Sequence, residues 1–292
     1  MSVKSVKRRL VDGVRLMRLD KPIGIFLLLW PLLWALWIAS RGRPDLRILA
    51  IFLAGTVVMR SAGCIINDFA DRDIDPHVKR TRDRPLAARR LSPQEALGLF
   101  AALIGLALWF VTRLDALTVR YAFVGAALTV SYPLMKRFFP LPQLYLGAAF
   151  GWAIPMAFMA TLGHVPRVGW TLFLVAVLWA GVYDTIYAMV DRDDDLKLEV
   201  KSSAILFGDM DRLLIGAMQA MVLLGLVSAG HLVGCGSPYY AGIAVGAALF
   251  AYQQWLIRGR ERNACFRAFL NNNLFGLAVF AGVALDYFMR PS

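Results

Sequence analysis

Long apolar runs, separated by mostly short polar connections, dominate this chain. Nine runs occur, at about residues 22–40, 47–66, 95–112, 117–132, 141–161, 170–189, 213–233, 239–257 and 273–289. A bilayer core about 30 Å thick needs roughly 20 residues of helix, and a lipid-exposed backbone must satisfy its own hydrogen bonds. The pattern therefore predicts an all-α, polytopic membrane protein with nine transmembrane helices in a single domain, residues 1–292.

The composition of the chain supports this class. Hydrophobic residues make up 59% of the 292 residues, and the mean hydropathy is +0.58. Soluble domains contain roughly 45–50% apolar residues, so a soluble core and disorder are both disfavoured. The net charge of +12 would suggest nucleic acid in a soluble protein, but a membrane accounts for it here, and no nucleic-acid partner is expected. The three cysteines, Cys64, Cys235 and Cys265, are too widely spaced to indicate a disulfide framework or a zinc site.

The positive charges are unevenly distributed between the connections. The N-terminal segment 1–21 and the second, fourth, sixth and eighth connections hold 24 of the 32 Lys and Arg residues. Because Lys and Arg accumulate on the cytoplasmic side of membrane proteins, we expect these segments in the cytoplasm and the C-terminus on the opposite side. The two long loops, 67–94 and 190–212, then share the cytoplasmic face.

Each of these two loops begins with an acidic cluster. At 100° per residue, each cluster would place three carboxylates on one face of a continuing helix: Asp68, Asp71 and Asp75 in the first, and Asp184, Asp191 and Asp195 in the second. Like charges on one face repel unless cations or protons neutralise them. Acids at the ends of membrane spans are functional by default, so we interpret the clusters as a ligand site rather than as solvated loop surfaces.

The chemistry of the clusters favours a magnesium-bound diphosphate. Carboxylate oxygens without His or Cys suit Mg²⁺ or Ca²⁺, and Mg²⁺ is usually held by one or two carboxylates together with phosphate oxygens. Arg80 and Arg84 follow the first cluster and Lys201 follows the second, which suits a polyanion. The alternative for these cations is that they only mark the cytoplasmic side.

Arg60 differs from the other cations because it lies within the second apolar run. An arginine at that depth needs a partner. It would share the helix face of Asp71 and lie about 16 Å deeper along the axis. We therefore expect Arg60 to pair either with the carboxylate of an acceptor substrate or with an acid of another span.

Several segments of the chain match known motifs. The two clusters read Asn67-Asp68-x-x-Asp71-x-x-x-Asp75 and Tyr183-Asp184-Thr185-x-Tyr187, continuing to Asp195, and further matches begin at Arg18, Gly147 and Ala264. In these motifs, and from about residue 13 to 288, the chain resembles the UbiA superfamily of intramembrane aromatic prenyltransferases, specifically the 4-hydroxybenzoate polyprenyltransferases of ubiquinone biosynthesis. Glu199 stands where this branch usually has glycine.

The resemblance implies a fold, a cofactor and substrates. The fold would be a nine-helix bundle around a central cavity, the cofactor Mg²⁺, the substrates a polyprenyl diphosphate and 4-hydroxybenzoate, and the location a lipid bilayer, the bacterial inner membrane. Protein partners stay open. Carried over by position, Asn67, Asp71, Asp75, Asp184, Asp191 and Asp195 would bind metal and diphosphate, Arg80, Arg84, Lys136 and Tyr187 would surround the diphosphate, and Arg60 or, failing that, Arg137 would bind the aromatic acid. Asp68 and Lys201 join the metal and diphosphate sets from the cluster pattern.

The implied reaction releases diphosphate and joins the allylic carbocation to the ring carbon ortho to the hydroxyl. Cationic residues would stabilise the leaving diphosphate, and a cavity within the bundle would exclude water. The ring proton would pass to Asp191 or to the diphosphate. Three alternatives remain. A divalent-cation transporter would gain nothing from the basic residues beside the acids, and a CDP-alcohol phosphotransferase would have its acids in one compact motif. The third is a prenyltransferase with a homogentisate, dihydroxynaphthoate or porphyrin acceptor.

Overall fold

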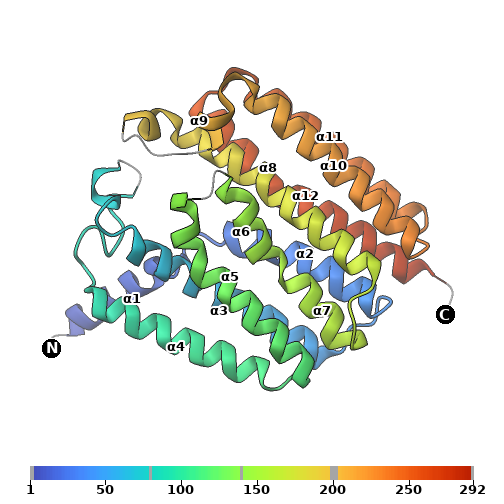
Figure 1. The fold of residues 1–292 in the computed structure, drawn as a ribbon, viewed down its shortest axis with the longest axis horizontal. Helices are drawn as coiled ribbons and strands as arrows, with labels where there is room; N and C mark the ends of the chain where they lie inside the picture. The colour runs from blue at the N-terminus through green and yellow to red at the C-terminus, as the bar shows by residue number, and fades with distance from the viewer. Residues whose placement is uncertain (1–2, 79–80, 139–140, 198–202, 291–292) are drawn as a thin grey trace.

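The computed structural model describes residues 3–78, 81–138, 141–197 and 203–290, and these residues form helices and turns without a strand (Figure 1). The α-helices are α1 (Val3–Leu16), α2 (Ile23–Ala39), α3 (Leu46–Ala70), α4 (Pro93–Val111), α5 (Ala116–Phe138), α6 (Pro142–Gly151), α7 (Ala153–Leu162), α8 (Arg167–Lys197), α9 (Ser203–Phe207), α10 (Asp211–Leu232), α11 (Ser237–Leu256) and α12 (Arg262–Met289). Three 3₁₀ turns join them, η1 (Asp75–His77), η2 (Gly208–Met210) and η3 (Ile257–Gly259). The predicted all-α class is confirmed.

The apolar runs of the sequence coincide with the long helices. Among the described residues, six helical segments are long and apolar enough to cross a bilayer: 46–70, 93–111, 142–162, 167–192, 205–232 and 262–289. Helix α2 is equally apolar but has only 17 residues. These segments indicate an integral membrane protein.

The fifth apolar run, 141–161, forms two helices rather than one. Helix α6 ends at Gly151 and α7 begins at Ala153. Pro155 lies four residues after Gly151 and has no N–H with which to bond the Gly151 carbonyl, so the hydrogen-bond ladder is interrupted there. The indole of Trp152, at the break, instead donates to the Tyr121 carbonyl of α5 over 2.8 Å.

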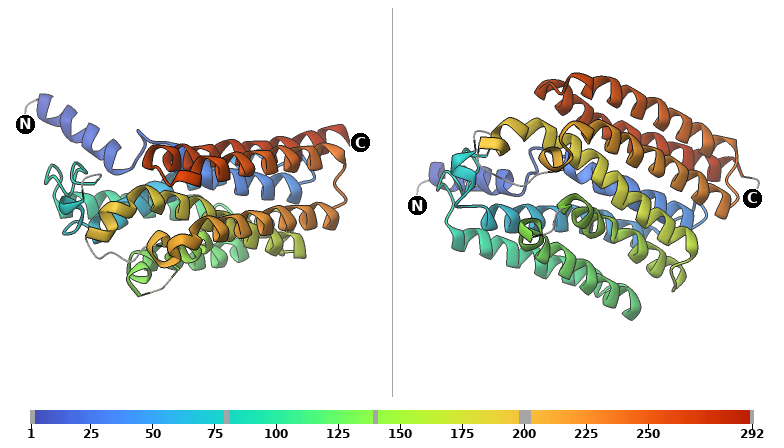
Figure 2. Two further views of the ribbon diagram at one scale, coloured as in Figure 1. Left: turned by 90° about the horizontal axis from the view of Figure 1, so that it is seen from above. Right: turned by 45° about the horizontal axis from the view of Figure 1, so that its top comes forward.

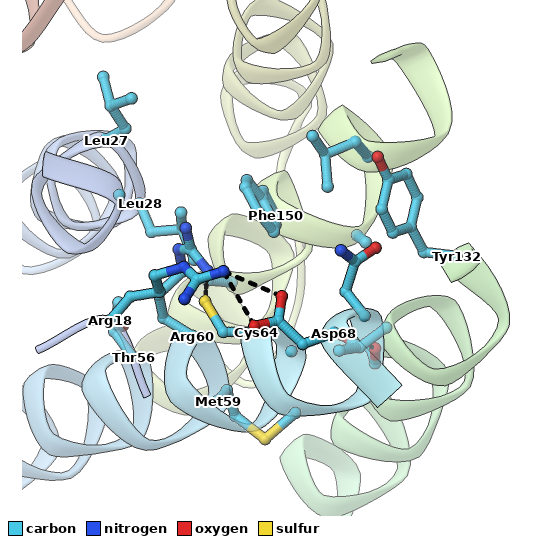
Figure 3. Close-up of a pocket in the computed structure, with 18 of the residues that line it drawn as sticks. Arg18, Leu27, Leu28, Thr56, Met59, Arg60, Cys64, Asp68, Tyr132 and Phe150 are labelled. Atoms are coloured by element: carbon cyan, nitrogen blue, oxygen red, sulfur yellow. Dashed lines mark hydrogen bonds and ion pairs between the residues drawn. The ribbon is translucent and has the colours of Figure 1, made fainter. Parts of the chain in front are cut away.

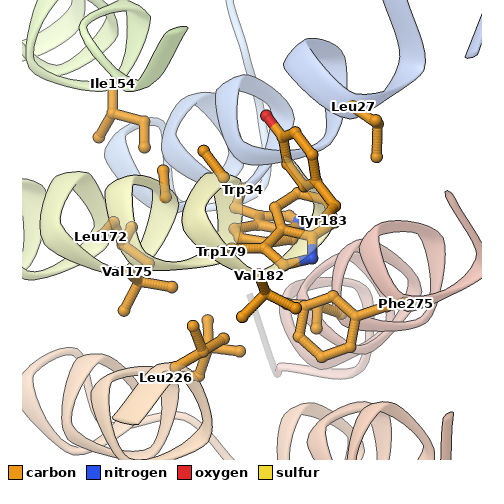
Figure 4. Close-up of a cluster of buried hydrophobic side chains, with 14 of the residues drawn as sticks. Leu27, Trp34, Ile154, Leu172, Val175, Trp179, Val182, Tyr183, Leu226 and Phe275 are labelled. Atoms are coloured by element: carbon orange, nitrogen blue, oxygen red, sulfur yellow. The ribbon is translucent and has the colours of Figure 1, made fainter. Parts of the chain in front are cut away.

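The first and last apolar helices lie side by side and form the centre of the core. Trp34 of α2 stacks on Trp179 of α8 at 5.4 Å, and Trp179 also contacts Phe275 of α12 at 5.3 Å (Figure 4). The Trp34 indole donates to the Gly276 carbonyl over 3.1 Å. A buried indole N–H needs such a partner where no water is present, so these bonds fix α2 against α12.

Close contact between the same two helices also depends on a glycine. A Cβ added at Gly276 would lie 2.3 Å from the Trp30 ring. The Trp30 indole donates to Asn273 Oδ1 over 2.8 Å, across 243 residues of chain. The glycine therefore makes room for the ring that joins α2 to α12.

The two ends of the bundle differ in what they carry. Helix α1, the turns after α3 and helix α9 gather at one end, whereas the C-terminus lies at the other (Figures 1 and 2). The described turns after α3 and helix α9, which follows α8 in the chain, therefore lie at a common end of the molecule.

Candidate active site

A cavity of about 1440 Å³ lies between α2, α3, α4, α5, α6 and α8. Apolar side chains line most of its length, and the polar groups gather toward the end of the bundle that carries α1. Figure 3 shows Arg60 and Asp68 of α3 on one side of the cavity and Tyr132 of α5 on another. Of the predicted site residues, the cavity brings together Arg60, Asn67, Asp68, Asp71, Asp75, Arg84, Asp184, Tyr187 and Asp191.

The side chains of the remaining predicted site residues are not among those that the structure describes. Arg80 and Lys201, together with Glu199, lie outside the described residues. Lys136 and Arg137 belong to the backbone of α5, and Asp195 to that of α8, but their side chains are not among those described. Their predicted roles stay predictions.

The first acidic cluster was expected to continue the helix, and this prediction is wrong. Helix α3 ends at Ala70, Asp71 caps it, and Asp75 opens the 3₁₀ turn η1. Pro76, which cannot donate a backbone hydrogen bond and disfavours helical geometry in the residue before it, prevents an α-helix from continuing through Asp75. The chain tightens instead, and the Ile74 N–H donates to the Asp71 carbonyl, three residues back, over 2.9 Å. Both carboxylates nevertheless line the cavity.

Local hydrogen bonds fix this turn. The buried Thr81 hydroxyl donates to the Asp75 carbonyl over 2.9 Å, and the Asn67 side-chain amide donates to Asp71 Oδ2 over 3.2 Å. The Thr81 bond holds the backbone of Asp75, and the Asn67 bond orients the carboxylate of Asp71. Thr81 was missed by the sequence analysis, since a lone threonine in a polar loop carries no signal.

Two arginines bind the carboxylates of the first cluster. Arg84 Nη1 lies 2.9 Å from Asp68 Oδ1 and 2.8 Å from Asp75 Oδ2. Arg18, from the turn between α1 and α2, lies 2.9 Å from both oxygens of Asp68. In the sequence, Arg18 stands out only as part of a family-like segment, because nothing there pairs it with a residue 50 positions later.

The second acidic cluster follows the expected helix. Helix α8 runs unbroken to Lys197, so Asp184 and Asp191 lie two turns apart on one face, and both line the cavity. Arg262, at the start of α12, places Nη2 at 3.7 Å from Asp191 Oδ1. In the sequence, Arg262 is one of several basic residues of the eighth connection, and only the fold brings it to Asp191.

Aromatic side chains complete the wall near this cluster. The Tyr187 ring packs on Phe269 of α12 with 4.7 Å between centroids. Phe150 and Trp152 also line the cavity, as does Tyr132, which the sequence analysis did not single out. The only available signal for Tyr132 was its position at the end of an apolar run.

Arg60 lies deeper along α3 than the acids. Its guanidinium contacts Cys64 Sγ and lies against Gly24 of α2, where an added Cβ would be 2.6 Å from it. Within the described residues Arg60 forms no ion pair with an acid, and its buried Nε has no hydrogen-bond partner. A cation in a membrane interior requires an anion, and the ligand carboxylate expected from the sequence stays a prediction.

The donor atoms of the cavity suit a hard cation. In the part of the chain that the structure describes, no three His, Cys, Asp or Glu side chains converge tightly enough to enclose a metal ion alone. Carboxylates of α3, η1 and α8 face the same space, however. This arrangement fits Mg²⁺, which takes few protein ligands and completes its shell with water and phosphate oxygens.

Comparison with curated proteins extends over nearly the whole chain. A relative from Alkalilimnicola ehrlichii, named 4-hydroxybenzoate octaprenyltransferase, is 56% identical over 286 residues, which cover 98% of each chain. A relative of the same name from Nitrosococcus oceani is 57% identical over 282 residues, 97% of this chain and 99% of its own.

Solved structures share the fold. The apo structure of a UbiA homologue from Aeropyrum pernix K1 matches with a TM-score of 0.79 at 26% identity, over 90% of this chain and 97% of that one. A UbiA homologue from Archaeoglobus fulgidus, bound to GPP and Mg²⁺, matches with a TM-score of 0.69 at 17% identity, over 94% and 99%. Residues 28–278 match the model of the UbiA prenyltransferase family. The resemblance inferred from the motifs is thus confirmed, and this chain belongs to the UbiA prenyltransferase family.

Proposed function

We propose that this protein transfers a polyprenyl group from polyprenyl diphosphate to the ring carbon ortho to the hydroxyl of 4-hydroxybenzoate, with release of diphosphate, in ubiquinone biosynthesis. The observation that carries the proposal is identity of 51–57% over nearly the full length to relatives named 4-hydroxybenzoate octaprenyltransferase. That name also supports an octaprenyl donor. The cavity supplies both a place for an apolar chain and charged groups for a diphosphate.

The donor's diphosphate would bind at the acidic end of the cavity. Asp71, Asp75, Asp184, Asp191 and Asp195 are the proposed Mg²⁺ residues, and the bound ion would neutralise the diphosphate and improve it as a leaving group. Asn67 orients Asp71. Arg84 and Tyr187, with Arg80, Lys136 and Lys201, would bind diphosphate oxygens. The GPP and Mg²⁺ bound to the Archaeoglobus fulgidus homologue support this assignment through the shared fold.

The acceptor would lie deeper in the cavity. Arg60 is the proposed partner of the 4-hydroxybenzoate carboxylate, with Arg137 as the second candidate. A planar guanidinium fixes a carboxylate through two hydrogen bonds, and this fixes the ring so that the carbon beside the hydroxyl faces the reactive end of the donor. The apolar walls exclude water from the carbocation, and Asp191 or the departing diphosphate would accept the ring proton.

The proposed topology has nine membrane spans in the bacterial inner membrane. The N-terminus and the loops after α3 and α8 would face the cytoplasm, and the C-terminus the opposite side. The uneven charge of the connections supports this orientation, as does the gathering of α1, η1 and α9 at one end of the bundle.

A direct assay tests the proposed function. The purified full-length protein in lipid is given a polyprenyl diphosphate, Mg²⁺ and 4-hydroxybenzoate, and the expected products are prenylated 4-hydroxybenzoate and diphosphate. Homogentisate and 1,4-dihydroxy-2-naphthoate serve as competing acceptors. Prenylation of either one in preference to 4-hydroxybenzoate would contradict the proposed acceptor, and metal flux without prenyl transfer would favour the transporter alternative.

A further inference from the structure

Asp68 is the most enclosed carboxylate of the first acidic cluster. It is 2% exposed, and the hydrogen bonds from Arg18 occupy both of its oxygens (Figure 3). Arg84 binds Asp68 Oδ1 as well. A carboxylate held by two guanidinium groups has little capacity left for a metal ion, because each oxygen already accepts at least one charge-assisted hydrogen bond.

Arg84 lies between the carboxylates of Asp68 and Asp75, both of which are buried. In the described residues, a single nitrogen, Nη1, makes its contacts with both Asp68 and Asp75. A guanidinium has five N–H groups on three nitrogens, so Nε and Nη2 stay available for another anion. Arg84 itself lines the cavity, which places that anion in the cavity.

The four charged groups Arg18, Asp68, Arg84 and Asp75 together have no net charge. Without Asp68 and Arg18, Arg84 and Asp75 would form a closed pair, in which the guanidinium competes with a metal ion for the Asp75 carboxylate. With Asp68 present, Arg84 keeps one carboxylate partner when Asp75 binds a metal ion instead. Arg18 neutralises the Asp68 carboxylate, because a buried charge needs a partner of opposite charge.

The backbone around Arg18 is held firmly in place. Arg18 has a φ of 56°, a left-handed conformation that a residue with a side chain keeps only where its surroundings fix it. Its guanidinium also donates to the Arg15 carbonyl over 3.1 Å. Helix α1 is docked by the ion pair of the buried Asp12 with Arg90, 2.9 Å apart, and by the buried Leu16.

We propose that Arg18 and Asp68 are positioning residues that hold the Arg84 guanidinium in the cavity wall, where it binds the diphosphate of the prenyl donor and leaves Asp75 free for metal. The inference rests on the proposed function and deepens it. It gives the turn between α1 and α2 a part in donor binding, and it takes Asp68 out of the predicted metal set.

The test measures three constants in the purified full-length protein: the KM for polyprenyl diphosphate, the KM for 4-hydroxybenzoate and the Mg²⁺ concentration for half activity. Asp68→Asn should raise the first and third by roughly 10- to 100-fold, the usual cost of losing a residue that orients a ligand-binding group. The KM for 4-hydroxybenzoate should change less than about twofold, because Asp68 acts on the donor site. Asp68→Glu keeps the charge and should recover part of the loss.

A double-mutant cycle separates positioning from direct metal binding. If Asp68 acts through Arg84, then Asp68→Asn adds little to the donor KM once Arg84→Gln is present. A defect that persists undiminished in the Arg84→Gln background would show that Asp68 binds the metal itself and would overturn the inference. If Asp68→Asn does not fold, the same cycle with Arg18→Gln decides the question.

Asp286→Asn is the matched control. Asp286 is equally buried, at 3% exposure, and pairs with Arg290 over 2.6 Å at the other end of α12, outside the cavity lining. It should reduce stability without changing the donor KM. An unchanged donor KM in a folded Asp68→Asn variant contradicts the inference. Absence of prenyl transfer by the unmutated protein contradicts the proposed function instead, and the cycle is then measured as affinity for inorganic diphosphate.

Discussion

In the first acidic cluster the carboxylates of Asp71 and Asp75 lie on a helix end and a 3₁₀ turn, whereas in the second those of Asp184 and Asp191 lie on an uninterrupted helix. Seven helical residues return to nearly the same face about 10 Å further along, so helix register already aligns the second pair. The first pair is aligned by side chains from elsewhere, among them Thr81 and Arg84.

This difference shows that two similar acidic motifs can reach one cavity by different means. A helix holds its side chains through backbone hydrogen bonds that do not depend on sequence, and a turn depends on the particular residues that satisfy its polar groups. We therefore expect the two clusters to be equally sensitive to loss of their acids but unequally sensitive to changes in the residues around them.

The largest effect should come from the acids and the metal they hold. Asp71→Asn and Asp191→Asn should each reduce kcat/KM by about 10²- to 10³-fold, and a chelator should abolish prenyl transfer, measured as radiolabelled product. Asp73→Asn is the control within the first motif, because its side chain is 82% exposed. Normal activity in one cluster's variant would mean that only the other cluster binds the donor, and normal activity in chelator would mean that prenyl transfer does not require the metal.

Arg60 sharpens the comparison, because the membrane part of α8, residues 171–190, has no Lys or Arg to match it. Arg60→Ala should raise the KM for 4-hydroxybenzoate by roughly 10- to 100-fold with little change in the donor KM, and Arg60→Lys should be intermediate, because it keeps the charge and loses the planar contact. Steady-state kinetics with each substrate varied in turn measures this. If only the donor KM rises, Arg60 belongs to the diphosphate site, and Arg137 becomes the candidate for the carboxylate.

A smaller effect should single out the first cluster. Thr81→Val removes the hydrogen bond to the Asp75 carbonyl, a loss of about 1 kcal/mol, or roughly fivefold in donor KM. Thr171→Val removes a similar bond to the Arg167 carbonyl at the start of α8, away from the cavity lining, and should leave the donor KM unchanged. Equal effects of the two variants would argue that the turn needs no side-chain support.

Much of the fold was predictable because lipid leaves the backbone few choices. Each apolar run coincides with helix, and the described acids of the two clusters line one cavity together with Asn67, Tyr187 and Arg60. The two errors of local structure, the break in the run 141–161 and the turn at the first cluster, both lie beside prolines, Pro155 and Pro76. At both places the prediction followed the hydrophobic and helical pattern and did not account for the N–H group that proline lacks.

The supporting residues of the site were not predictable. Arg18, Tyr132 and Arg262 reach the cavity or its acids from α1's turn, α5 and α12. Their roles arise from contacts between helices distant in sequence, and a basic residue in a cytoplasmic connection looks the same whether it binds a ligand or only marks the side of the membrane. Only the packing distinguishes the two.

The last prediction should leave activity unchanged and tests whether both clusters face one side. Single cysteines at the exposed Arg82 and Asp209, beside the first and second clusters, should resist an impermeant thiol reagent in intact cells, and one at the exposed Arg43, between α2 and α3, should react. Background should be low, since Cys64 and Cys265 are buried and burial raises the pKa of Cys235 to about 11. Labelling of only one of Arg82→Cys and Asp209→Cys would show that the two clusters lie on opposite sides of the membrane.

The contact between α2 and α12 has a consequence for biosynthesis. The first apolar helix to leave the ribosome receives its indole acceptors, Asn273 and the Gly276 carbonyl, from the last one. Until α12 is inserted, Trp30 and Trp34 have no such partners in lipid, and the cavity lacks the wall that Phe266 and Phe269 supply. The nascent chain therefore completes the wall of its cavity only when α12 is inserted, and a chain truncated before Arg262 should insert its earlier helices yet hold no donor.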